Sequence, residues 1–290
     1  PENLFAHTHR NPSAMENAID RLAQAVIADG CVDPASAKQN PVAASLLLGR
    51  APKLRSGAFD PLANETAVQF AVRAVRDMEG GVLAIQGPPG AGKTFTGATI
   101  IRDLVKRKKK VGVMATSHKV ILNLLKAVLD LNPNEPIAVA HKGDEDQVDG
   151  SHPNITPLAR NEAARDALRD GTANVVGGTA WMWAREDFAN TIDVLFIDEA
   201  AQMSLANALA ASHAATRVVL LGDPQQLEQP KKGSHPEGVD ASALGHMLGD
   251  HPTIPKERGI FLPGTWRLAP SVAGFTSELF YDGLLASKPH

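Results

Sequence analysis

The sequence predicts an α/β fold in which helices cover both faces of a parallel β-sheet. From about residue 59 onward, short apolar runs alternate with helical stretches, an order that is typical of right-handed βαβ units. These runs are almost continuously apolar, as expected for strands that are covered on both faces. The 290 residues are 43% hydrophobic and 21% charged, close to the averages of globular domains that bury a core.

Residues 1–58 are expected to form a helical accessory segment, or stalk, ahead of this domain. Apolar side chains recur at helical spacing between Met15 and Val26, and a second short helix is predicted over 43–48. Proline and glycine residues then interrupt the pattern. The remainder, residues 59–290, is predicted to be a single α/β lobe.

Six apolar runs predict the strands of the sheet. They cover residues 82–85, 111–114, 137–139, 175–176, 194–197 and 217–221. Helices are predicted from Thr94, from about Lys119 and near 158–169. The segment of about 141–157 is polar, carries acidic residues and is interpreted as a surface insertion.

Composition and charge exclude several classes of protein. The 29 basic and 32 acidic residues give a net charge of −3, so any argument for nucleic-acid binding must be local. No apolar run reaches the length of a membrane helix and no secretory signal is present, so we expect a cytoplasmic protein without a membrane partner. The single Cys31 excludes an internal disulfide and a four-cysteine zinc site. Because the chain starts at Pro1 and stops at His290, a fragment of a longer protein is expected.

A glycine-rich motif follows the first of the predicted strands. It reads Gly87-Pro88-Pro89-Gly90-Ala91-Gly92-Lys93-Thr94, with Phe95 next in the chain, and matches G-x-x-x-x-G-K-[ST] between a strand and a helix. Glycines let the backbone turn its N–H groups towards phosphate oxygens, and the helix adds the positive end of its dipole. Lys93 is predicted to reach the β- and γ-phosphates of ATP, and the Thr94 hydroxyl to ligate Mg²⁺. The alternative is a Gly/Pro turn with an incidental lysine.

An acidic pair, Asp198 and Glu199, follows the strand predicted at 194–197. Ligands of a parallel sheet bind beyond the carboxyl ends of its strands, which is where this pair is expected. Asp198 is predicted to hold Mg²⁺, and Glu199 to orient and deprotonate the attacking water. The alternative is a solvated helix start, where the helix dipole favours acidic residues.

A third motif, residues 222–227, ends the next predicted strand. Its Gln226 can hydrogen-bond a γ-phosphate and respond to the loss of that phosphate. A plain turn at Asp223 and Pro224 is the alternative, although such a turn leaves the pair of glutamines unexplained.

In this order, the three motifs resemble those of the first RecA-like lobe of superfamily-1 helicases. More narrowly they resemble the B-type branch, which includes the nonsense-mediated decay RNA helicase and the replication nuclease–helicase. Residues 115–118, 177–180, 265–270 and 280–283 are similar to further motifs of that branch. The segments 233–238, 242–244 and 253–255 resemble more particularly bacterial fusions of a RecB-like nuclease to this helicase.

The resemblance implies roles for particular residues. Arg267 would contact the γ-phosphate, and Gln226 would couple the state of that phosphate to the nucleic-acid path. The residues that would contact a single strand of DNA or RNA are Thr116, Ser117, His118 and Thr179. The family also has a glutamine that reads adenine, for which Gln69 is the candidate, at a spacing that departs from the family pattern.

The resemblance also implies partners outside this chain. A second RecA-like lobe, with the arginine that completes the ATP site, would lie beyond His290, and the full protein can carry a nuclease domain. As one lobe of an ATP-dependent helicase, the chain is expected to bind ATP and Mg²⁺ but to hydrolyse ATP poorly by itself. The alternative function is a nucleotide-dependent switch that binds nucleic acid or protein without moving along it.

Three smaller patterns have ordinary explanations. The basic run 106–110 is interpreted as a solvated helix end rather than a phosphate contact. Trp181 and Trp183 are expected to pack in the interior rather than stack on bases. His7 and His9 lack partners at the spacing of zinc ligands.

Overall fold

The computed structural model describes residues 11–29, 41–143, 152–226, 238 and 240–289. Among these residues, the strands of the central sheet are β1 (Lys53–Leu54), β2 (Met78–Gln86), β3 (Val111–Met114), β4 (Val139–Lys142), β5 (Ile155–Leu158), β6 (Val175–Gly177), β7 (Ile192–Ile197), β8 (Ala215–Gly222) and β9 (Gly259–Phe261). A separate pair of short strands, β10 (Gly264–Thr265) and β11 (Ala286–Ser287), lies near the C-terminus.

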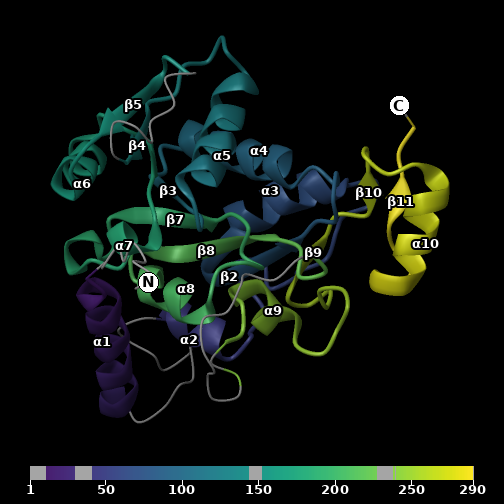
Figure 1. Ribbon diagram of the computed structural model, residues 1–290, viewed down its shortest axis with the longest axis horizontal. Coiled ribbons are helices and arrows are strands. Elements are labelled where there is room, and N and C mark those ends of the chain that lie inside the picture. The colour runs from purple at the N-terminus through teal and green to yellow at the C-terminus, as the bar shows by residue number, and fades with distance from the viewer. Residues whose placement is uncertain (1–10, 30–40, 144–151, 227–237, 239, 290) are drawn as a thin grey trace, which may run out of the picture.

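Helices cover both faces of the central sheet (Figure 1). One face carries α3 (Ala67–Asp77), α4 (Lys93–Lys106) and α5 (His118–Asp130). The other face is covered by α1 (Ser13–Asp29), α2 (Pro41–Leu47), α6 (Asn161–Asp170), α7 (Ala180–Trp183), α8 (Leu205–Ser212) and α9 (Ala243–Leu248), and the 3-10 turn η2 (Glu186–Phe188) follows α7. None of the helices that the structure describes is both long enough and apolar enough to cross a membrane.

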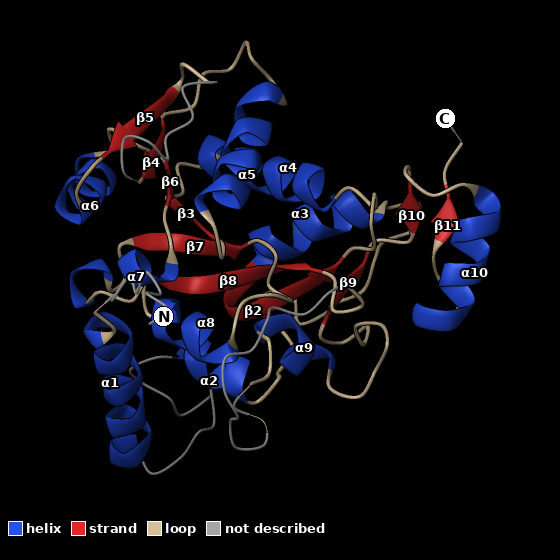
Figure 2. Cartoon of the chain, viewed as in Figure 1, coloured by secondary structure: helices blue, strands red, loops and turns tan. Residues whose placement is uncertain are grey.

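The strands follow the order β1-β2-β8-β7-β3-β6-β4-β5 across the sheet, and β9 also pairs with β2. Figure 2 labels the strands of this sheet from β2 to β9. Every neighbouring pair from β2 to β5 along this order is parallel, as is β9 with β2. The edge strand β1 alone among the described strands of the sheet runs antiparallel to its neighbour. The predicted α/β fold, a parallel sheet with helices on both faces, is therefore confirmed.

The alternation of side chains along each strand explains the two helical layers. In β2, Val82 and Ala84 pack into the core beneath α2 and α8, whereas Leu83 and Ile85 pack into the core beneath α3 and α4. All four side chains are completely buried. Because both faces are covered, such a strand reads in the sequence as an uninterrupted apolar run.

The N-terminal part is more closely joined to the sheet than a separate stalk would be. Val42, Ala43 and Leu46 of α2 are almost completely buried in the same core as Val82 of β2. Residues 53–54, for which no strand was predicted, form β1 at the edge of the sheet. The packing of this layer therefore crosses the predicted boundary at residue 58, while α1 packs farther out against α8.

The polar segment 141–157 differs from its interpretation as a surface insertion. Its two ends belong to strands, because β4 runs through Lys142 and β5 begins at Ile155 and pairs parallel to β4. Residues 144–151 lie outside the described residues. β5 ends the strand order, and its exposed Thr156 and Pro157 fit an edge strand, where proline is tolerated and one side faces solvent.

The last described residues form a small C-terminal unit, residues 264–289, beside the sheet (Figure 1). In it α10 (Pro270–Phe280) packs against β11, which pairs with β10. Several large apolar side chains of this unit are exposed to solvent. They are Trp266, Val272, Phe275, Leu279, Phe280 and Leu284.

Candidate functional site

The loops that follow the parallel strands meet at one edge of the sheet, which we call the carboxyl edge. Met114 at the end of β3 is level with Ile197 of β7. Ile197 is level with Leu220 of β8, and Leu220 with Ala84 of β2. The four strands therefore end side by side, and the loops that leave them bring the three predicted motifs together, as the parallel arrangement requires.

The glycine-rich loop, which we call the phosphate loop, joins β2 to α4 at this edge. Gly87 N donates to Gly222 O at 2.9 Å, so the loop starts against the end of β8. Gly92 precedes α4 with a φ of 85°, a left-handed conformation that glycine adopts without strain. The first N–H groups of α4 have no partners within the helix, and together with the helix dipole they favour an anion. Lys93 Nζ donates to Gly87 O at 2.8 Å, across the loop.

The residues of the phosphate loop differ in exposure along its length. Gly87 and Pro88 are buried, whereas Thr94 and Phe95 in the first turn of α4 are exposed. Ala91 packs partly against the core. Its N–H donates to Pro88 O at 3.0 Å. The backbone of the loop therefore curls with alanine at this position.

The acidic pair follows β7. Asp198 is buried, and its N–H donates to Met114 O at 2.8 Å. Burial and the negative charge of Glu199 raise the pKa of Asp198 to about 6, although the Glu199 N–H and the positive charge of Lys93 act in the opposite direction. Glu199 has a φ of 51°, a left-handed conformation that costs a non-glycine residue about 1–2 kcal/mol. The unfavourable charge of Asp198 and the strained backbone of Glu199 therefore occur together beside Lys93, and such strain is typical of functional sites.

The loop after β8 is organised around the Asp223 carboxylate, which is almost completely buried. Its Oδ1 accepts from Gln225 N at 3.3 Å, and its Oδ2 accepts from Gln226 Nε2 at 3.2 Å. Gln226 N also donates to Asp223 O at 3.1 Å, which closes a turn. The turn and the glutamine were alternative interpretations of this motif. The structure shows the turn, which holds the Gln226 side chain, and the contact of Gln226 with a γ-phosphate stays a prediction.

Arg267 belongs to a loop that docks directly on the phosphate loop. Trp266 N donates to Gly90 O at 3.0 Å, and Thr265 Oγ1 donates to Pro89 O at 2.8 Å. Thr265 Oγ1 also accepts from Arg267 N at 3.2 Å. Arg267 is exposed, and its backbone is anchored next to the phosphate loop through Thr265.

The residues predicted to contact a nucleic-acid strand lie at two neighbouring strand ends. Thr116 and Ser117 follow β3, Thr179 follows β6, and these two strands are parallel neighbours. Thr116 and Ser117 are exposed, and Thr179 is half-buried. Ser117 also caps α5, because its Oγ accepts from Val120 N at 3.3 Å. Their arrangement at one edge is consistent with a shared ligand, and the strand contacts themselves stay predictions.

His118 is held by a second histidine that the sequence did not single out. His118 Nδ1 and His141 Nε2 are 3.0 Å apart, with the two rings edge to face. His141 is completely buried, and its Nδ1 has no partner in the part of the chain that the structure describes. Burial, with smaller contributions from His118 and Lys142, lowers the pKa of His141 to about 4. His141 is therefore uncharged near neutral pH.

We expect His141 to make the stability of the chain rise with pH between about 4 and 6.5. In this range the unfolded chain, whose histidine has its ordinary pKa, binds a proton that the folded His141 does not bind. One unit of pKa corresponds to about 1.4 kcal/mol, so this histidine should lower the free energy of unfolding by about 2 kcal/mol between pH 7 and about pH 5. Urea unfolding at both pH values, for the wild-type chain and for His141→Gln, measures this difference. Equal pH dependence in the two chains would contradict the assignment.

Gln69, the candidate for adenine recognition, lies in the first turn of α3 and is exposed. Its Oε1 accepts from Thr66 N at 2.9 Å, and Gln69 N donates to Thr66 Oγ1 at 3.2 Å. These reciprocal bonds form a capping box, which stabilises the start of the helix. The Gln69 side chain thus has a structural role here, and adenine recognition stays a prediction.

The basic run 106–110 lies at the opposite edge of the sheet, just before β3. Lys109 Nζ pairs with Asp193 at 2.9 Å, and Lys106 Nζ with Glu135 at 2.8 Å. The run is thus partly neutralised and far from the carboxyl edge along the strands, which agrees with its interpretation as a solvated helix end.

The first two tryptophans belong to the interior, as expected. Trp183 is completely buried, and its Nε1 donates to Val113 O at 3.3 Å. Trp181 is half-buried against the same core. His7, His9 and Cys31 lie outside the described residues.

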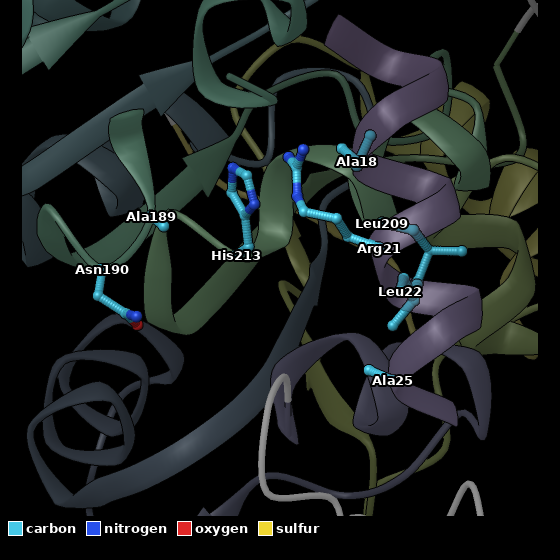
Figure 3. Close-up of a pocket in the computed structure, with 9 residues that line it drawn as sticks. Ala18, Arg21, Leu22, Ala25, Ala189, Asn190, Leu209 and His213 are labelled. Atoms are coloured by element: carbon cyan, nitrogen blue, oxygen red, sulfur yellow. The ribbon is translucent and has the colours of Figure 1, made fainter. Parts of the chain in front are cut away.

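A pocket between α1 and α8 lies away from all these motifs (Figure 3). Small and apolar side chains form most of its wall, together with Arg21, Asn190 and His213. Arg21 Nη2 donates to Ala184 O at 3.3 Å, and His213 Nε2 lies 3.0 Å from Trp183 O. Two of its polar side chains are therefore already bonded within the protein, and none of the predicted site residues lines it.

Two further residues at the carboxyl edge were not predicted from the sequence as site residues. Thr265 anchors the loop of Arg267 on the phosphate loop, and Tyr281 OH donates to Asp223 Oδ2 at 2.8 Å. Both residues lie within stretches that resemble helicase motifs, but that resemblance gave neither a role. Long-range hydrogen bonds of this kind leave no periodic signal in a single sequence.

Comparison with known families supports a nucleotide site. Residues 69–247 match a family model described as an AAA domain. This match covers the phosphate loop, the acidic pair and the loop of Gln226, and it implies that the chain binds nucleotide.

Curated relatives are much longer than this chain. The DNA replication ATP-dependent helicase/nuclease DNA2 of Saccharomyces cerevisiae is 27% identical over 270 residues, which cover 85% of this chain and 17% of that protein. The protein of the same name from Schizosaccharomyces pombe is 25% identical over 210 residues, covering 69% of this chain and 14% of that protein. The chain thus spans less than a fifth of the length of the curated relatives it matches.

The solved structures that match this chain include two of an arterivirus helicase. The complex of arterivirus nonstructural protein 10 (helicase) with DNA is 16% identical, with a TM-score of 0.45, and the match covers 80% of this chain and 46% of that one. The crystal structure of the same helicase is 18% identical, with a TM-score of 0.47, and the match covers 79% of this chain and 44% of that one.

Proposed function

We propose a function from one premise: this chain belongs to the AAA domain family. It is the ATP-binding motor lobe of a helicase, which in the full protein couples ATP hydrolysis to movement along a single strand of DNA or RNA. The observation that carries the proposal is the docking of residues 265–267 on the phosphate loop, through Thr265 Oγ1 and Trp266 N. This docking brings Arg267 to a loop that already presents Lys93 and the start of a helix.

The residues at the carboxyl edge supply the chemistry of hydrolysis. Lys93 and the N–H groups of the phosphate loop bind the phosphates, and Glu199 orients the attacking water and accepts its proton. The water oxygen attacks the γ-phosphorus in line, and the bond from that phosphorus to the oxygen of ADP breaks. Arg267 and Gln226 contact the γ-phosphoryl oxygens, where negative charge develops.

Mg²⁺ fits the residues present at this edge. A hydroxyl and a carboxylate are the oxygen ligands that Mg²⁺ prefers, and Thr94 and Asp198 provide them. Asp198 is buried with a raised pKa, which means that its negative charge is unfavourable until a cation compensates it. The ion supplies charge neutralisation on the phosphates when it is bound.

A nucleic-acid strand is the partner that fits the other half of the carboxyl edge. Thr116, Ser117, His118 and Thr179 offer hydroxyl and ring N–H groups, which can bond to phosphate oxygens of either nucleic acid. Contacts of this kind distinguish RNA only when they reach the 2′-hydroxyl. The names of the relatives refer to DNA replication, which favours DNA.

A second RecA-like lobe and a nuclease domain complete the proposal for the full protein. The exposed apolar side chains of α10 include Phe275, of which 67% is exposed. A cluster of this kind is typical of a surface that another protein element covers, and the second lobe is the element we propose. The word nuclease in the names of the relatives supports a fused nuclease, which we propose to be of the RecB-like kind found in bacterial fusions.

A strand titration tests this function. Labelled single-stranded DNA and RNA are titrated into the chain without nucleotide, with ADP, and with a non-hydrolysable ATP analogue, each at two salt concentrations. A motor lobe should change its affinity for the strand with the nucleotide. If the strand affinity changes with the nucleotide but the full-length chain does not move along the strand, the binding switch is favoured. No strand binding by the full-length chain in any nucleotide state would contradict the helicase.

Lys93→Ala should lower the affinity for ATP by about 10- to 100-fold. Hydrogen bonds from a charged donor to phosphate contribute about 1.5–3 kcal/mol each, and a factor of ten corresponds to about 1.4 kcal/mol. In Lys93→Ala, the nucleotide-dependent change in strand affinity should also disappear.

Lys53→Ala is the matched control for Lys93→Ala, measured by the same titrations. Lys53 forms a surface pair with Glu79 at 3.0 Å, at the other end of β2. Its loss removes the same charge, and such a surface pair contributes about 1 kcal/mol or less. Equal ATP affinities in the two variants would contradict the role of Lys93.

A further inference from the structure

The Asp223 carboxylate joins its own loop to a segment 58 residues away in the sequence. Its Oδ2 accepts from Gln226 Nε2 at 3.2 Å and from Tyr281 OH at 2.8 Å. Asp223 follows β8 at the carboxyl edge, whereas Tyr281 directly follows α10 in the C-terminal unit, as its C-cap residue. The same carboxylate oxygen therefore connects the Gln226 side chain to the C-terminal unit.

The bond between Tyr281 and Asp223 is well protected from solvent. Tyr281 is 2% exposed and Asp223 is 1% exposed. Burial and the neighbouring Asp223 charge raise the pKa of Tyr281 well above its usual range, so the phenol keeps its proton and donates. A hydrogen bond from a hydroxyl to a carboxylate is among the stronger kinds, and an unbonded buried carboxylate is costly.

Further contacts hold the C-terminal unit in this place. Thr253 Oγ1 donates to Oδ2 of Asp282 at 2.6 Å, and Asp282 is the residue that follows Tyr281. The Tyr281 ring also packs against Phe261 of β9, with ring centres 5.9 Å apart. On the other side of the same region, Gln225 Nε2 donates to Pro252 O at 3.2 Å. The segment around residues 252–254 thus contacts both the loop of Gln226 and the end of α10.

The bond to Asp223 leaves Gln226 able to bind a ligand. A glutamine amide has two N–H donors and one acceptor oxygen. Asp223 uses one of the donors. Within the part of the chain that the structure describes, no hydrogen bond from the Gln226 side chain uses the second donor or the oxygen. A carboxylate that holds one N–H also polarises the amide and restricts its rotation.

We propose that Tyr281 is a positioning residue that acts through Asp223 on Gln226. It fixes the Gln226 amide only while the C-terminal unit, which also carries Arg267, is docked at the carboxyl edge. The γ-phosphate contacts of Gln226 and Arg267 are therefore formed together. This inference rests on the proposed function, which gives Gln226 its role at the γ-phosphate.

Tyr281→Phe tests the inference, because it keeps the ring and removes only the hydroxyl. The first measurement is the NMR signal of the Gln226 side-chain NH₂, identified by its loss in Gln226→Ala. This signal should shift and exchange faster with solvent in Tyr281→Phe. An unchanged signal would overturn the proposal whatever the chain binds.

The second measurement is the ratio of strand affinities with the ATP analogue and with ADP. Tyr281→Phe should reduce this ratio by about fivefold, in the range typical of coupling between sites, while the affinity for the nucleotide itself changes by less than about twofold. Adding Tyr281→Phe to Gln226→Ala should cause no further loss in the ratio, because Tyr281 acts only through the Gln226 side chain. Independent, additive losses would overturn the coupling.

Ser287→Ala is the matched control for a general loosening of the C-terminal unit. It removes the bond from Ser287 Oγ to Leu268 O, 2.7 Å long, within the same unit and without touching Asp223. It should leave the Gln226 signal and the affinity ratio unchanged. The same Gln226 shift in this variant would overturn a specific role for Tyr281. A wild-type chain whose strand affinity ignores the nucleotide would instead refute the motor function, while the Gln226 signal still decides the role of Tyr281.

Discussion

Gly90→Ala is expected to lower the affinity of the chain for ATP by at least about tenfold and to loosen the C-terminal unit. A Cβ atom at position 90 would lie 2.4 Å from Arg267 Cβ and 2.9 Å from Arg267 N. It would also lie 3.0 Å from Thr265 Oγ1, the atom that anchors this loop on Pro89. Two of these atoms belong to the side chain stem and backbone of Arg267, so the whole loop must move away from the phosphate loop.

Gly171→Ala separates the clash from the backbone strain. Gly90 and Gly171 have nearly the same φ, 75° and 73°, but a Cβ at Gly171 meets no atom within 4 Å. Alanine in this conformation costs about 1–2 kcal/mol of stability by itself. Gly171→Ala should lose only this amount of stability and bind ATP as the wild-type chain does. Gly90→Ala should lose more stability and also bind ATP more weakly.

Thermal unfolding and equilibrium ATP titration of the two glycine variants measure these effects. If both variants lose the same stability and both bind ATP as the wild-type chain does, the docking of residues 265–267 does not matter for the nucleotide site. That result would remove the observation on which the proposed function depends.

Asp198→Asn is expected to stabilise the chain in magnesium-free buffer while it abolishes the effect of Mg²⁺ on ATP binding. The pKa of Asp198 is raised from 3.8 to about 6 in the folded state. Between these values the folded chain binds a proton that the unfolded chain has lost, so stability falls as pH rises through this range and stays lower above it. A shift of about two units corresponds to about 3 kcal/mol, which the neutral asparagine should largely recover.

Asp187→Asn is a control of the opposite sign. The Arg185 guanidinium beside Asp187 holds the pKa of that carboxyl below its usual value, so the Asp187 charge stabilises the fold and its removal should lower the melting temperature. Asp198→Asn should raise the melting temperature at about pH 7.5, and its ATP affinity should be the same with and without Mg²⁺. A lowered melting temperature together with retained magnesium dependence would contradict the role given to Asp198.

The sequence was sufficient to predict those parts of the molecule that depend on a local pattern of residues. The phosphate loop was predictable because a strand, a glycine-rich turn and a helix are contiguous in the chain. The acidic pair and Gln226 were placed near it because parallel strands share one carboxyl edge. β5 was missed because an edge strand with exposed Thr156 and Pro157 has no apolar run.

The contacts that complete the site required the structure. Thr265 bonds to Pro89 across 176 residues of sequence, and Tyr281 bonds to Asp223 across 58. Such pairs depend on how the C-terminal unit packs against the sheet. Neither the residue types nor their spacing in the sequence predicts this packing. The His118–His141 pair escaped for the same reason, since His141 lies in a strand that was predicted only by its apolar neighbours.

The docking of Trp266 on the phosphate loop gives the chain an optical property. The sequence has three tryptophans, and their environments differ: Trp183 is completely buried, Trp181 is half-buried and Trp266 is 57% exposed. A water-borne quencher such as acrylamide therefore acts mainly on the indole of Trp266, whose backbone N–H bonds to Gly90 O. The quenched fraction of the fluorescence reports on the nucleotide site of the unlabelled protein, with the emission of the buried indole as an internal reference.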